Sequence, residues 1–444
     1  MYLNLDARTF SACMYRAAVR LVFITLSLLF CINTVNGATE PQSGEPLTLV
    51  MAIKKTLSLN PQLQVFAYRQ QALDGLAQTA ALSPVMEVGV DLENMLGTGE
   101  AQGIGGAELT IALSSVLEMG DKRGARSQVV TSSRAVLAAQ KRADSLDLLG
   151  EVTRRYIAVL AAQAQLGLAK EAKELASSTL DIVKNRVAAA ASPIAEVKRA
   201  TAALGQAQLT LLSEQQKLKY LHIALAAMWA ETNPQFSEVD GELFRFGTDT
   251  DFDALYAKVQ QNPAIQVFAA KQRLRNTQVR LAETQSSGDI SWSLGARRLQ
   301  GASDTALVAG FSMPLFSSKR NSGAISTAQA LRNEVSVQRD VALLNMYSQL
   351  YRAYHNRKQA IISAQALQNT IIPALQQALT ETQSAYQRGR YSYLEYISAK
   401  QELLNARRTS IEAAFAALTY GAEIEQLTAE PLAAPQHEFS GITQ

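Results

Sequence analysis

The chain has 444 residues, a formal net charge of +3 at pH 7 and 48% hydrophobic residues. This balance of charge gives no reason to expect nucleic acid as a partner. Both cysteines, Cys13 and Cys31, lie within the first 37 residues, so removal of that segment would exclude disulfides, thiolate metal sites and cysteine nucleophiles.

The N-terminal 37 residues have the pattern of a cleavable secretory signal peptide. Three arginines precede an apolar run at 21–32, and the small-residue spacing of a cleavage site follows at Val35 and Gly37. The run is too short to span a bilayer comfortably as a permanent helix. We therefore expect cleavage near Gly37 or Ala38 rather than an uncleaved anchor. Cys31 lies inside the apolar run with a bulky residue before it, so we expect no lipid anchor.

Two tandem copies of one unit follow the signal peptide. NPQLQVFA from Asn60 and NPAIQVFA from Asn262 are identical at six of eight positions. LEMGDKRG from Leu117 has a counterpart in LFSSKRNSG from Leu315, and a third pair, NRVAAAASPIAEV and QRGRYSYLEY, follows in the same order. Recurrence of three landmarks in order indicates a duplication. The expected divisions are a signal peptide at 1–37, a first repeat at 38–245, a second repeat at 246–430 and a polar C-terminal tail at 431–444.

Within each repeat, a helix after the NP motif is followed by a change of hydrophobic period to two. From residue 85, Met86, Val88 and Val90 alternate with polar or small residues, and a similar alternation begins at Ala107. This pattern predicts β-strands with one apolar face. We expect helices at 62–81 and 264–284, and β-hairpins at about 85–117 and 288–315.

Each hairpin is followed by a very long helical hairpin. Residues 122–187 contain no proline, and their apolar residues recur at spacings of three and four. A helix of this length would be on the order of 100 Å long. We expect helical hairpins at about 122–230 and 322–427, with the first turn before Pro193, the second at RGRYSY and a kink at Pro373.

These elements cannot form one compact globule. Amphipathic strands of this length match membrane-spanning strands, although a half-buried sheet in a soluble domain has the same pattern. Four strands cannot close a barrel, and open sheet edges are not viable in hydrocarbon. Two, three or four protomers would supply eight, twelve or sixteen strands, and the repeat pattern does not choose among them. The long, alanine-rich helices favour coiled-coil-like packing, so a filamentous scaffold is the alternative.

Several motifs resemble the TolC superfamily of outer-membrane efflux proteins, specifically its cobalt-zinc-cadmium resistance (CzcC-like) branch. They are SPVMEVGVDLENMLGTG, LTIALSSVLEMGDKRGARS, SPIAEVKRA, FSMPLF and RNSG. The chain departs from the family pattern at Ser115–Val116, where the family usually has a glutamine, and at SSKRNSG, which replaces a shorter version. The resemblance covers nearly the whole mature chain.

The resemblance implies a mainly α fold with a β-barrel part, in which a homotrimer forms a twelve-stranded barrel and a long periplasmic α-helical barrel. Such proteins contact outer-membrane lipid, a periplasmic adaptor and an inner-membrane RND pump. The implied function is a passive export duct for heavy-metal cations, of the cobalt/zinc/cadmium or copper/silver class. The alternatives are a duct for organic compounds or drugs and, in another class, a periplasmic adaptor or scaffold.

The resemblance also implies functional positions at the two helix-hairpin tips. In similar channels, a tyrosine of the second tip pairs with an acid of the first tip and holds the mouth shut, and Tyr386 and Glu196 fall at the matching places. Glu395 falls where such channels carry a ring of acids, which would favour cations. Gly389 is expected to permit a positive φ in the second tip, whereas the first tip has only alanine at 188–191. The alternative for both acids is a solvated charge on a helix surface.

Charged residues at the polar positions of the strands are candidates for lining the barrel lumen. Four carboxylates facing lipid would be too costly, so we expect them to face water with an arginine as counter-charge. The candidates are Glu87, Asp91, Glu93, Glu108 and Arg297.

No motif indicates an enzyme, a cofactor or a resident metal. The three histidines, His222, His355 and His437, are too far apart in sequence to form a local metal motif. The glycines of LGTGEAQGIGG have the wrong spacing for a dinucleotide-binding loop and do not lead into a helix. This segment is therefore predicted to be an extracellular loop.

Overall fold

The computed structural model describes residues 46–248, 250–315 and 317–432. The predicted signal peptide and most of the predicted tail lie outside these residues. The chain divides into two units, one comprising residues 1–46 with 235–238 and the other residues 47–234 with 239–444. Of the smaller unit, only Pro46 and residues 235–238 are described, and these are irregular. All elements below belong to the larger unit.

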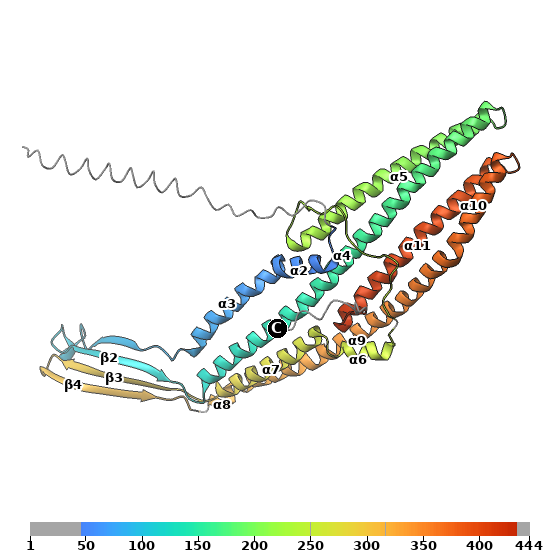
Figure 1. Cartoon of the computed structure of the whole chain (residues 1–444). Coiled ribbons are helices and arrows are strands. Elements are labelled where there is room, and N and C mark those ends of the chain that lie inside the picture. The colour runs from blue at the N-terminus through green and yellow to red at the C-terminus, as the bar shows by residue number, and fades with distance from the viewer. Residues whose placement is uncertain (1–45, 249, 316, 433–444) are drawn as a thin grey trace, which may run out of the picture. The chain divides into compact units, whose positions relative to one another are not determined.

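The same series of elements occurs twice along the larger unit (Figure 1). The first series comprises α2 (Leu49–Leu59), α3 (Pro61–Ala81), β1 (Glu87–Glu93), β2 (Glu108–Leu117), α4 (Lys122–Ala188) and α5 (Ile194–Ala226). The second comprises α6 (Phe252–Val259), α7 (Pro263–Thr284), β3 (Ile290–Leu299), β4 (Asp304–Ser312), α9 (Ser322–Ala366), the π-helical turn η3 (Leu367–Ile371), α10 (Ile372–Gln387) and α11 (Tyr393–Thr428). Three short helices are η1 (Gly99–Ala101), η2 (Ala227–Trp229) and α8 (Ser317–Arg320).

The observed bounds follow those of the predicted helices and strands closely, and the short elements α2, η1, α6 and α8 are additions. The short helices α2 and α6, which precede the two NP motifs, were not predicted. They are only 11 and 8 residues long, and α2 is held in place by packing against α4 and η2. A helix of this length is marginal by itself, so its stability comes from contacts that a local pattern does not reveal.

The duplicated NP motif has the same double role in both copies. Asn60 caps α3 by accepting a hydrogen bond from the amide of Gln62 at 2.8 Å, and its side-chain amide donates to the carbonyl of Met228 at 2.7 Å. Asn262 caps α7 in the same way and donates to the carbonyl of Leu427 at 2.9 Å. Both asparagines are buried, and proline follows each at the first helical position, where its missing N–H is harmless. The motif thus starts one helix and ties it to the end of another.

The four strands form one antiparallel sheet in the order β1-β2-β3-β4. One residue row runs from Val90 through Ile111 and Ala296 to Leu307. Because side chains alternate between faces, the rows on either side of this one point to the opposite face. The sheet therefore has one apolar face, whose large side chains are mostly exposed, and one polar face. The alternation predicted from the sequence is confirmed by this register.

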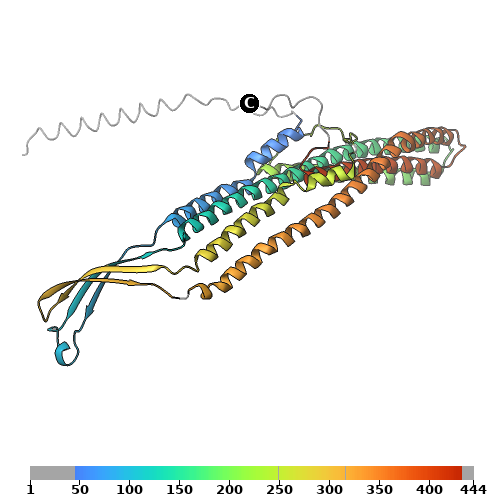
Figure 2. The same cartoon turned by 90° about the horizontal axis from the view of Figure 1, so that it is seen from below.

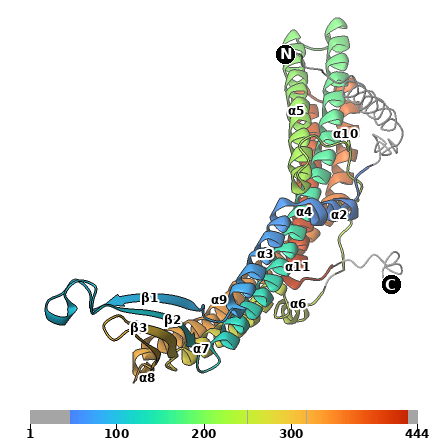
Figure 3. The ribbon, with the colours of Figure 1, turned by 90° about the vertical axis from the view of Figure 1, so that its left-hand side faces the viewer.

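The helices continue from one end of the sheet as a layer (Figure 2). Near the sheet, α3 packs on α4, α4 on α7 and α7 on α9; farther along, α5 packs on α4, α4 on α11 and α11 on α9 and α10. Figure 3 shows α5 and α10 in the part of the layer remote from the strands. Because α4 and α9 are 67 and 45 residues long, both helices contribute to the two parts of the layer.

No helix among the described residues combines the length and the apolar character required to cross a membrane.

The predicted irregularity at Pro373 takes the form of a wider helical turn. Five residues, Leu367–Ile371, form the π-helical turn η3 between α9 and α10. Proline has no N–H to donate and its ring clashes with the carbonyl four residues earlier. A π turn relieves that clash while the chain continues as a helix. The corresponding helix of the first copy, α4, has no proline and is continuous.

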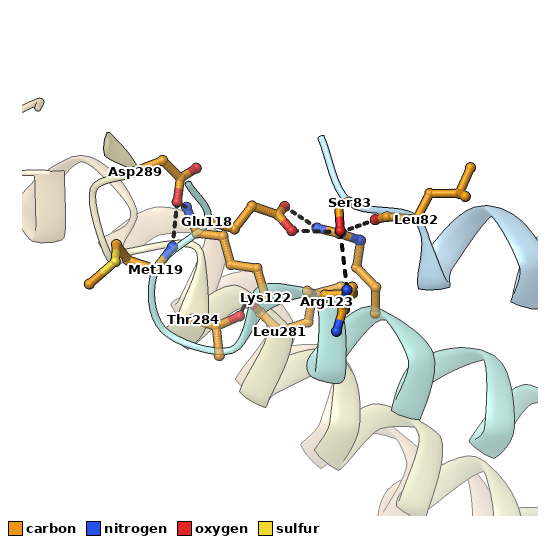
Figure 4. A network of polar contacts seen from close by, with 10 residues as sticks. Leu82, Ser83, Glu118, Met119, Lys122, Arg123, Leu281, Thr284 and Asp289 are labelled. Carbon is orange, nitrogen blue, oxygen red and sulfur yellow. Dashed lines mark hydrogen bonds and ion pairs between the residues drawn. The ribbon is translucent and has the colours of Figure 1, made fainter. Parts of the chain in front are cut away.

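The LEMGDKRG motif forms a polar junction between sheet and helices (Figure 4). Glu118 pairs with Arg126, and one of their hydrogen bonds is 2.9 Å long. Asp289, just before β3, accepts a hydrogen bond from the amide of Met119 at 3.0 Å and pairs with Lys122 at 2.7 Å. Gly120 has φ +76°, and a side chain there would approach Ser287 to within 2.7 Å. The junction therefore joins the two copies where strands become helices.

Replacement of Asp289 by alanine is expected to weaken this junction. The change leaves the Lys122 ammonium, whose side chain is only 11% exposed, and the Met119 amide without their partner. We expect a loss of about 2 kcal/mol in the free energy of unfolding, measured by chemical denaturation followed by tryptophan fluorescence. Asp74→Ala is the matched control, because Asp74 pairs with Arg134 at a more exposed position and should cost no more than about 0.5 kcal/mol. Equal losses in both variants would contradict the assignment.

Candidate functional site at the helix-hairpin tips

The two helical hairpins end in the same backbone motif. In the first tip, the amide of Ala191 donates to the carbonyl of Arg186 and that of Ala190 to the carbonyl of Val187. The second tip repeats both bonds one repeat later, from Arg390 to Ala385 and from Gly389 to Tyr386. This pair of bonds is the Schellman motif, which requires a left-handed residue after the helix.

The left-handed position is occupied by different residues in the two tips. Gly389 has φ +73°, as expected from the sequence, and the equivalent residue of the first tip, Ala190, has φ +56°. Glycine adopts this conformation freely, whereas alanine brings its Cβ too close to the following carbonyl oxygen. The first tip is therefore strained at the position where the second is relaxed.

Tyr386 and Glu196 are brought together between the tips. The Tyr386 hydroxyl donates a hydrogen bond to Oε2 of Glu196 at 2.8 Å. The ring is 1% exposed and stacks on Tyr396 at a centroid distance of 5.4 Å, with Tyr393 edge-on at 6.2 Å. Burial raises the pKa of Tyr386 to about 12, and the bond to Glu196 acts in the same direction. The phenol is therefore a protonated donor throughout the physiological range.

Arg186 makes a second link between the tips that sequence reasoning missed. Its guanidinium donates to the carbonyls of Tyr386 at 2.6 Å and Gln387 at 3.0 Å. It also donates to the carbonyl of Ala191 and the hydroxyl of Ser192, both at 3.0 Å. The guanidinium carbon lies 4.6 Å from the centre of the Tyr386 ring. One side chain of the first tip thus binds the carboxyl end of α10, where a positive charge is favoured by the helix dipole.

Glu395 has a local structural partner. Its carboxylate accepts hydrogen bonds from the amide and the hydroxyl of Ser392 at 2.7 and 2.8 Å, and its own amide binds the Ser392 hydroxyl in return. This capping box begins α11. The hydrogen bonds from the Ser392 backbone and hydroxyl lower the pKa of Glu395. The side chain therefore carries a negative charge at an exposed helix start.

A buried lysine lies near the tip on α11. Lys400 is 7% exposed and donates a hydrogen bond to the hydroxyl of Thr179 at 3.2 Å. The same hydroxyl lies 3.3 Å from that of Tyr396. Burial lowers the pKa of Lys400 to about 8. The Lys400–Thr179 hydrogen bond thus links α11 to α4, one helical turn from the packed rings of Tyr386, Tyr393 and Tyr396.

The five charged strand candidates lie on one face of the sheet. By register, Glu87, Asp91 and Glu93 alternate with the apolar row of β1, and Asp91 is aligned through β2 with Arg297. The Arg297 guanidinium pairs with Glu108 at 2.8 Å and with Glu93 at 3.2 Å. The expected counter-charge is therefore in contact with two of the four acids. The carboxylates of Glu87 and Asp91 are not within ion-pair distance of Arg297. These two acids therefore add negative charge to the face.

The described residues contain no cluster of three or more histidine, cysteine, aspartate or glutamate side chains that could hold a metal ion. His222 lies on α5 and His355 on α9, and burial lowers the pKa of His222. His355 packs against the rings of Tyr351 and Tyr354. His437 lies outside the described residues.

A sheet with one apolar face, joined to long paired helices in two copies, is the architecture of the TolC-like outer-membrane channels. The fold matches the crystal structure of CusC, a transmembrane channel, with a TM-score of 0.71 and 16% identity over 86% of this chain and 91% of that chain. The expected fold class, mainly α with a β-barrel part and a helical barrel, is confirmed by this likeness. The model of the outer membrane efflux protein family matches residues 52–231 and 254–430. The chain belongs to this family.

Two relatives are metal-resistance proteins. The cobalt-zinc-cadmium resistance protein CzcC of Cupriavidus metallidurans is 26% identical over 322 residues, which cover 70% of this chain and 75% of the relative. The nickel-cobalt-cadmium resistance protein NccC of Alcaligenes xylosoxydans xylosoxydans is 22% identical over 339 residues, covering 73% of each. The resemblance to the metal-resistance branch is thus confirmed.

Reciprocal substitutions of the left-handed residues, Gly389 and Ala190, are expected to change the stability of the two tips in opposite directions. Gly389→Ala should destabilise the second tip by about 1 kcal/mol, and the amides of residues 389 and 390 should exchange with deuterium about fivefold faster. Ala190→Gly should relieve strain and slow exchange of the corresponding amides at 190 and 191, by roughly twofold after the entropy of glycine is counted. Hydrogen exchange with mass spectrometry measures both. A change in the same direction in the two variants would contradict the strain argument.

Proposed function

We propose that this chain is the outer-membrane channel of a tripartite RND-type efflux system, a passive export duct for heavy-metal cations. The observation that carries the proposal is that both the sheet and the helical layer end in uncovered edges on the same two sides. The signal peptide at 1–37, the two repeats at 38–245 and 246–430 and the absence of a lipid anchor are parts of this proposal.

The uncovered edges support assembly into a ring. Strands β1 and β4 each have a partner on one side only, and in the helical layer α3 and α5 form one edge and α9 and α10 the other. Large apolar side chains are exposed on these edge helices. The exposed set includes Val65, Tyr68 and Leu76 on α3, Leu209, Leu212 and Tyr220 on α5, and Val337, Val341 and Leu344 on α9.

Joining unlike edges head to tail makes a closed ring if the rotation closes. Pairing β1 of one protomer with β4 of the next would supply hydrogen-bond partners for the backbone N–H and C=O groups of these edges, which hydrocarbon cannot do. Strand arithmetic permits several ring sizes, and membership in the efflux family supports three copies, with twelve strands. The apolar face of the sheet would then contact outer-membrane lipid, and the helices would form the periplasmic tunnel.

The polar face of the sheet would line the lumen of this barrel. Among the described strand residues, one arginine and five carboxylates lie on it, the fifth being Asp304. Each protomer therefore contributes net negative charge. Three protomers related by symmetry would concentrate the electrostatic field along one axis and favour cations. Selection among metals is assigned to the pump, because a passive duct need not bind its cargo selectively.

The tips would form the periplasmic mouth, where an adaptor docks and closure occurs. The Tyr386–Glu196 bond and the Arg186 contacts hold the two tips of one protomer together. We propose these contacts as the latch of the closed mouth. Glu395 would contribute a ring of three negative charges beside it, and Gly389 would allow the tip turn to rearrange.

The cargo assignment rests on CzcC and NccC, which are named for resistance to metals. Deletion of the gene is therefore expected to lower resistance to one or more of zinc, cobalt, cadmium, nickel, copper and silver, measured as the minimal inhibitory concentration. Resupplying the gene should restore it. Unchanged metal resistance with new sensitivity to organic compounds would contradict the metal cargo but would be compatible with an export duct for organic compounds. Recovery of the mature protein as a soluble monomer would contradict the channel and favour a periplasmic adaptor or scaffold.

Weakening the latch should raise the open fraction of the channel. Tyr386→Phe with Glu196→Ala removes a hydrogen bond to a charged group, worth about 1.5 kcal/mol, which corresponds to an increase of roughly tenfold in the open-to-closed ratio. Conductance of single channels in planar bilayers measures this, and adding Arg186→Gln should increase it further.

The control is Tyr391→Phe with Glu174→Ala, which changes the same residue types at exposed positions and should leave conductance unaltered. Equal conductance of the latch variant and the unmodified channel would remove these residues from the mouth.

A further inference from the structure

Cations gather at the end of the sheet that meets the helices. They come from three helices that lie together there: Arg280 of α7 is 4.0 Å from Asp121, which precedes α4, and Asn321, which follows α8, donates to the carbonyl of Ala282 in α7. The cations are Lys122, Arg123 and Arg126 at the start of α4, Arg280 near the end of α7, and Lys319 and Arg320 in α8.

Half of these cations are committed to acids. Arg126 is paired with Glu118, Lys122 with Asp289 and Arg280 with Asp121. The remaining three, Arg123, Lys319 and Arg320, are exposed and have no carboxylate within ion-pair distance among the described side chains. Arg123 donates only to the hydroxyl of Ser83, at 3.1 Å (Figure 4). The further acids among the described residues of this end are Glu283 on α7 and Glu87 at the start of β1. They are two against three unpaired cations, so this end keeps a net positive charge.

Exposed apolar side chains lie next to these cations. Because the strands are antiparallel, the starts of β1 and β3 and the ends of β2 and β4 share this end of the sheet. Six residues at or beside these strand ends are large, apolar and more than one-third exposed: they are Val85, Met86, Leu117, Met119, Met313 and Leu315. An apolar band bordered by unpaired cations is the arrangement expected where a protein passes from hydrocarbon to headgroups.

The other end of the sheet has the opposite character. The described side chains there include the acids Glu93, Glu108 and Asp304, and Arg297 is paired with two of them. Arg298 is the one further cation of that end, and it donates to the hydroxyl of Thr305. Unpaired positive charge is thus concentrated at the end nearest the helices, which has three such cations against Arg298 alone among the described side chains of the other end.

We propose that Arg123, Lys319 and Arg320 form a binding surface for the phosphodiester headgroups of anionic glycerophospholipids in the leaflet nearest the helical tunnel. The inference rests on the proposed function, because it requires the sheet to lie in a membrane. Guanidinium and ammonium groups bind phosphate oxygens through charge-assisted hydrogen bonds. The paired cations Lys122 and Arg126 hold the start of α4 in place and so keep Arg123 beside the apolar band.

Trp292 is the probe for this surface. It lies two residues inside β3 at the same end of the sheet, on the apolar face opposite Phe311. The second tryptophan, Trp229, is buried in η2 and supplies a constant background. The protein is reconstituted in phosphatidylcholine vesicles that contain either brominated phosphatidylglycerol or brominated phosphatidylcholine, and quenching of Trp292 gives the relative binding constant of the two lipids.

The unmodified protein should prefer the anionic lipid several-fold, up to about fivefold for each cation at low salt. Arg123→Gln, Lys319→Gln and Arg320→Gln together should bring the ratio close to one. The matched control, Lys184→Gln with Arg388→Gln and Arg390→Gln, removes the same charge from exposed positions at the tips and should keep the preference. High salt should abolish the preference of the unmodified protein, which tests the same charges without any substitution.

Equal quenching by the two lipids at low salt, or a preference kept by the triple variant, would overturn the lipid surface and leave the channel intact. Quenching by neither lipid would overturn the membrane-embedded sheet and the lipid surface together.

Discussion

The unpaired backbone groups along β1 and β4 are the constraint on which the rest of the structure depends. A four-stranded sheet can satisfy its interior ladder but not its edges, and its exposed apolar face makes water an unfavourable surrounding on that side. The helical layer has the same defect, with apolar side chains exposed on α3 and α5 at one edge and on α9 at the other. The proposed head-to-tail ring would remove both defects at once, because the same assembly pairs the strand edges and covers the helix edges.

The duplication provides two copies of each helix cap and each hairpin tip, and the two repeats differ in the residues through which they contact each other. Asn60 and Asn262 cap their helices identically but bind the ends of different elements, η2 and α11. At the tips the backbone motif is shared, yet only the first copy supplies Arg186, and it binds carbonyls of the second. A proline, Pro373, interrupts the long helix of the second repeat, whereas the corresponding helix of the first repeat, α4, is continuous. These differences convert two similar units into a pair whose contacts are directional, as the proposed gating and docking at one end would require.

Local pattern was sufficient for elements whose stability is local. Alternation around Val88 and Val90 predicted the strands and their faces, and the Asn-Pro signals located the starts of α3 and α7. The Tyr386–Glu196 pair was anticipated from the resemblance, not from spacing. Arg186 and Asp289 were missed because each acts on a partner far along the chain, and nothing in its neighbourhood distinguishes it from a solvated charge. Glu395 shows the reverse: its Ser392 capping box is a local signal that the sequence contains, whereas the sequence-based interpretations of this residue were only a ring of acids or a solvated surface charge.

Charge is distributed along the chain in a way that suits a duct without an energy source. The polar face of the sheet has more carboxylates than cations, and the junction with the helices has excess cations on the outside, where the paired ones are locked by Glu118 and Asp289. A passive channel must favour its cargo only weakly, because tight binding would slow release. Arg297 shares its single positive charge between Glu93 and Glu108 and so reduces the net negative charge of the polar face by one. In the proposed channel, the polar face of the sheet would attract cations through a diffuse field.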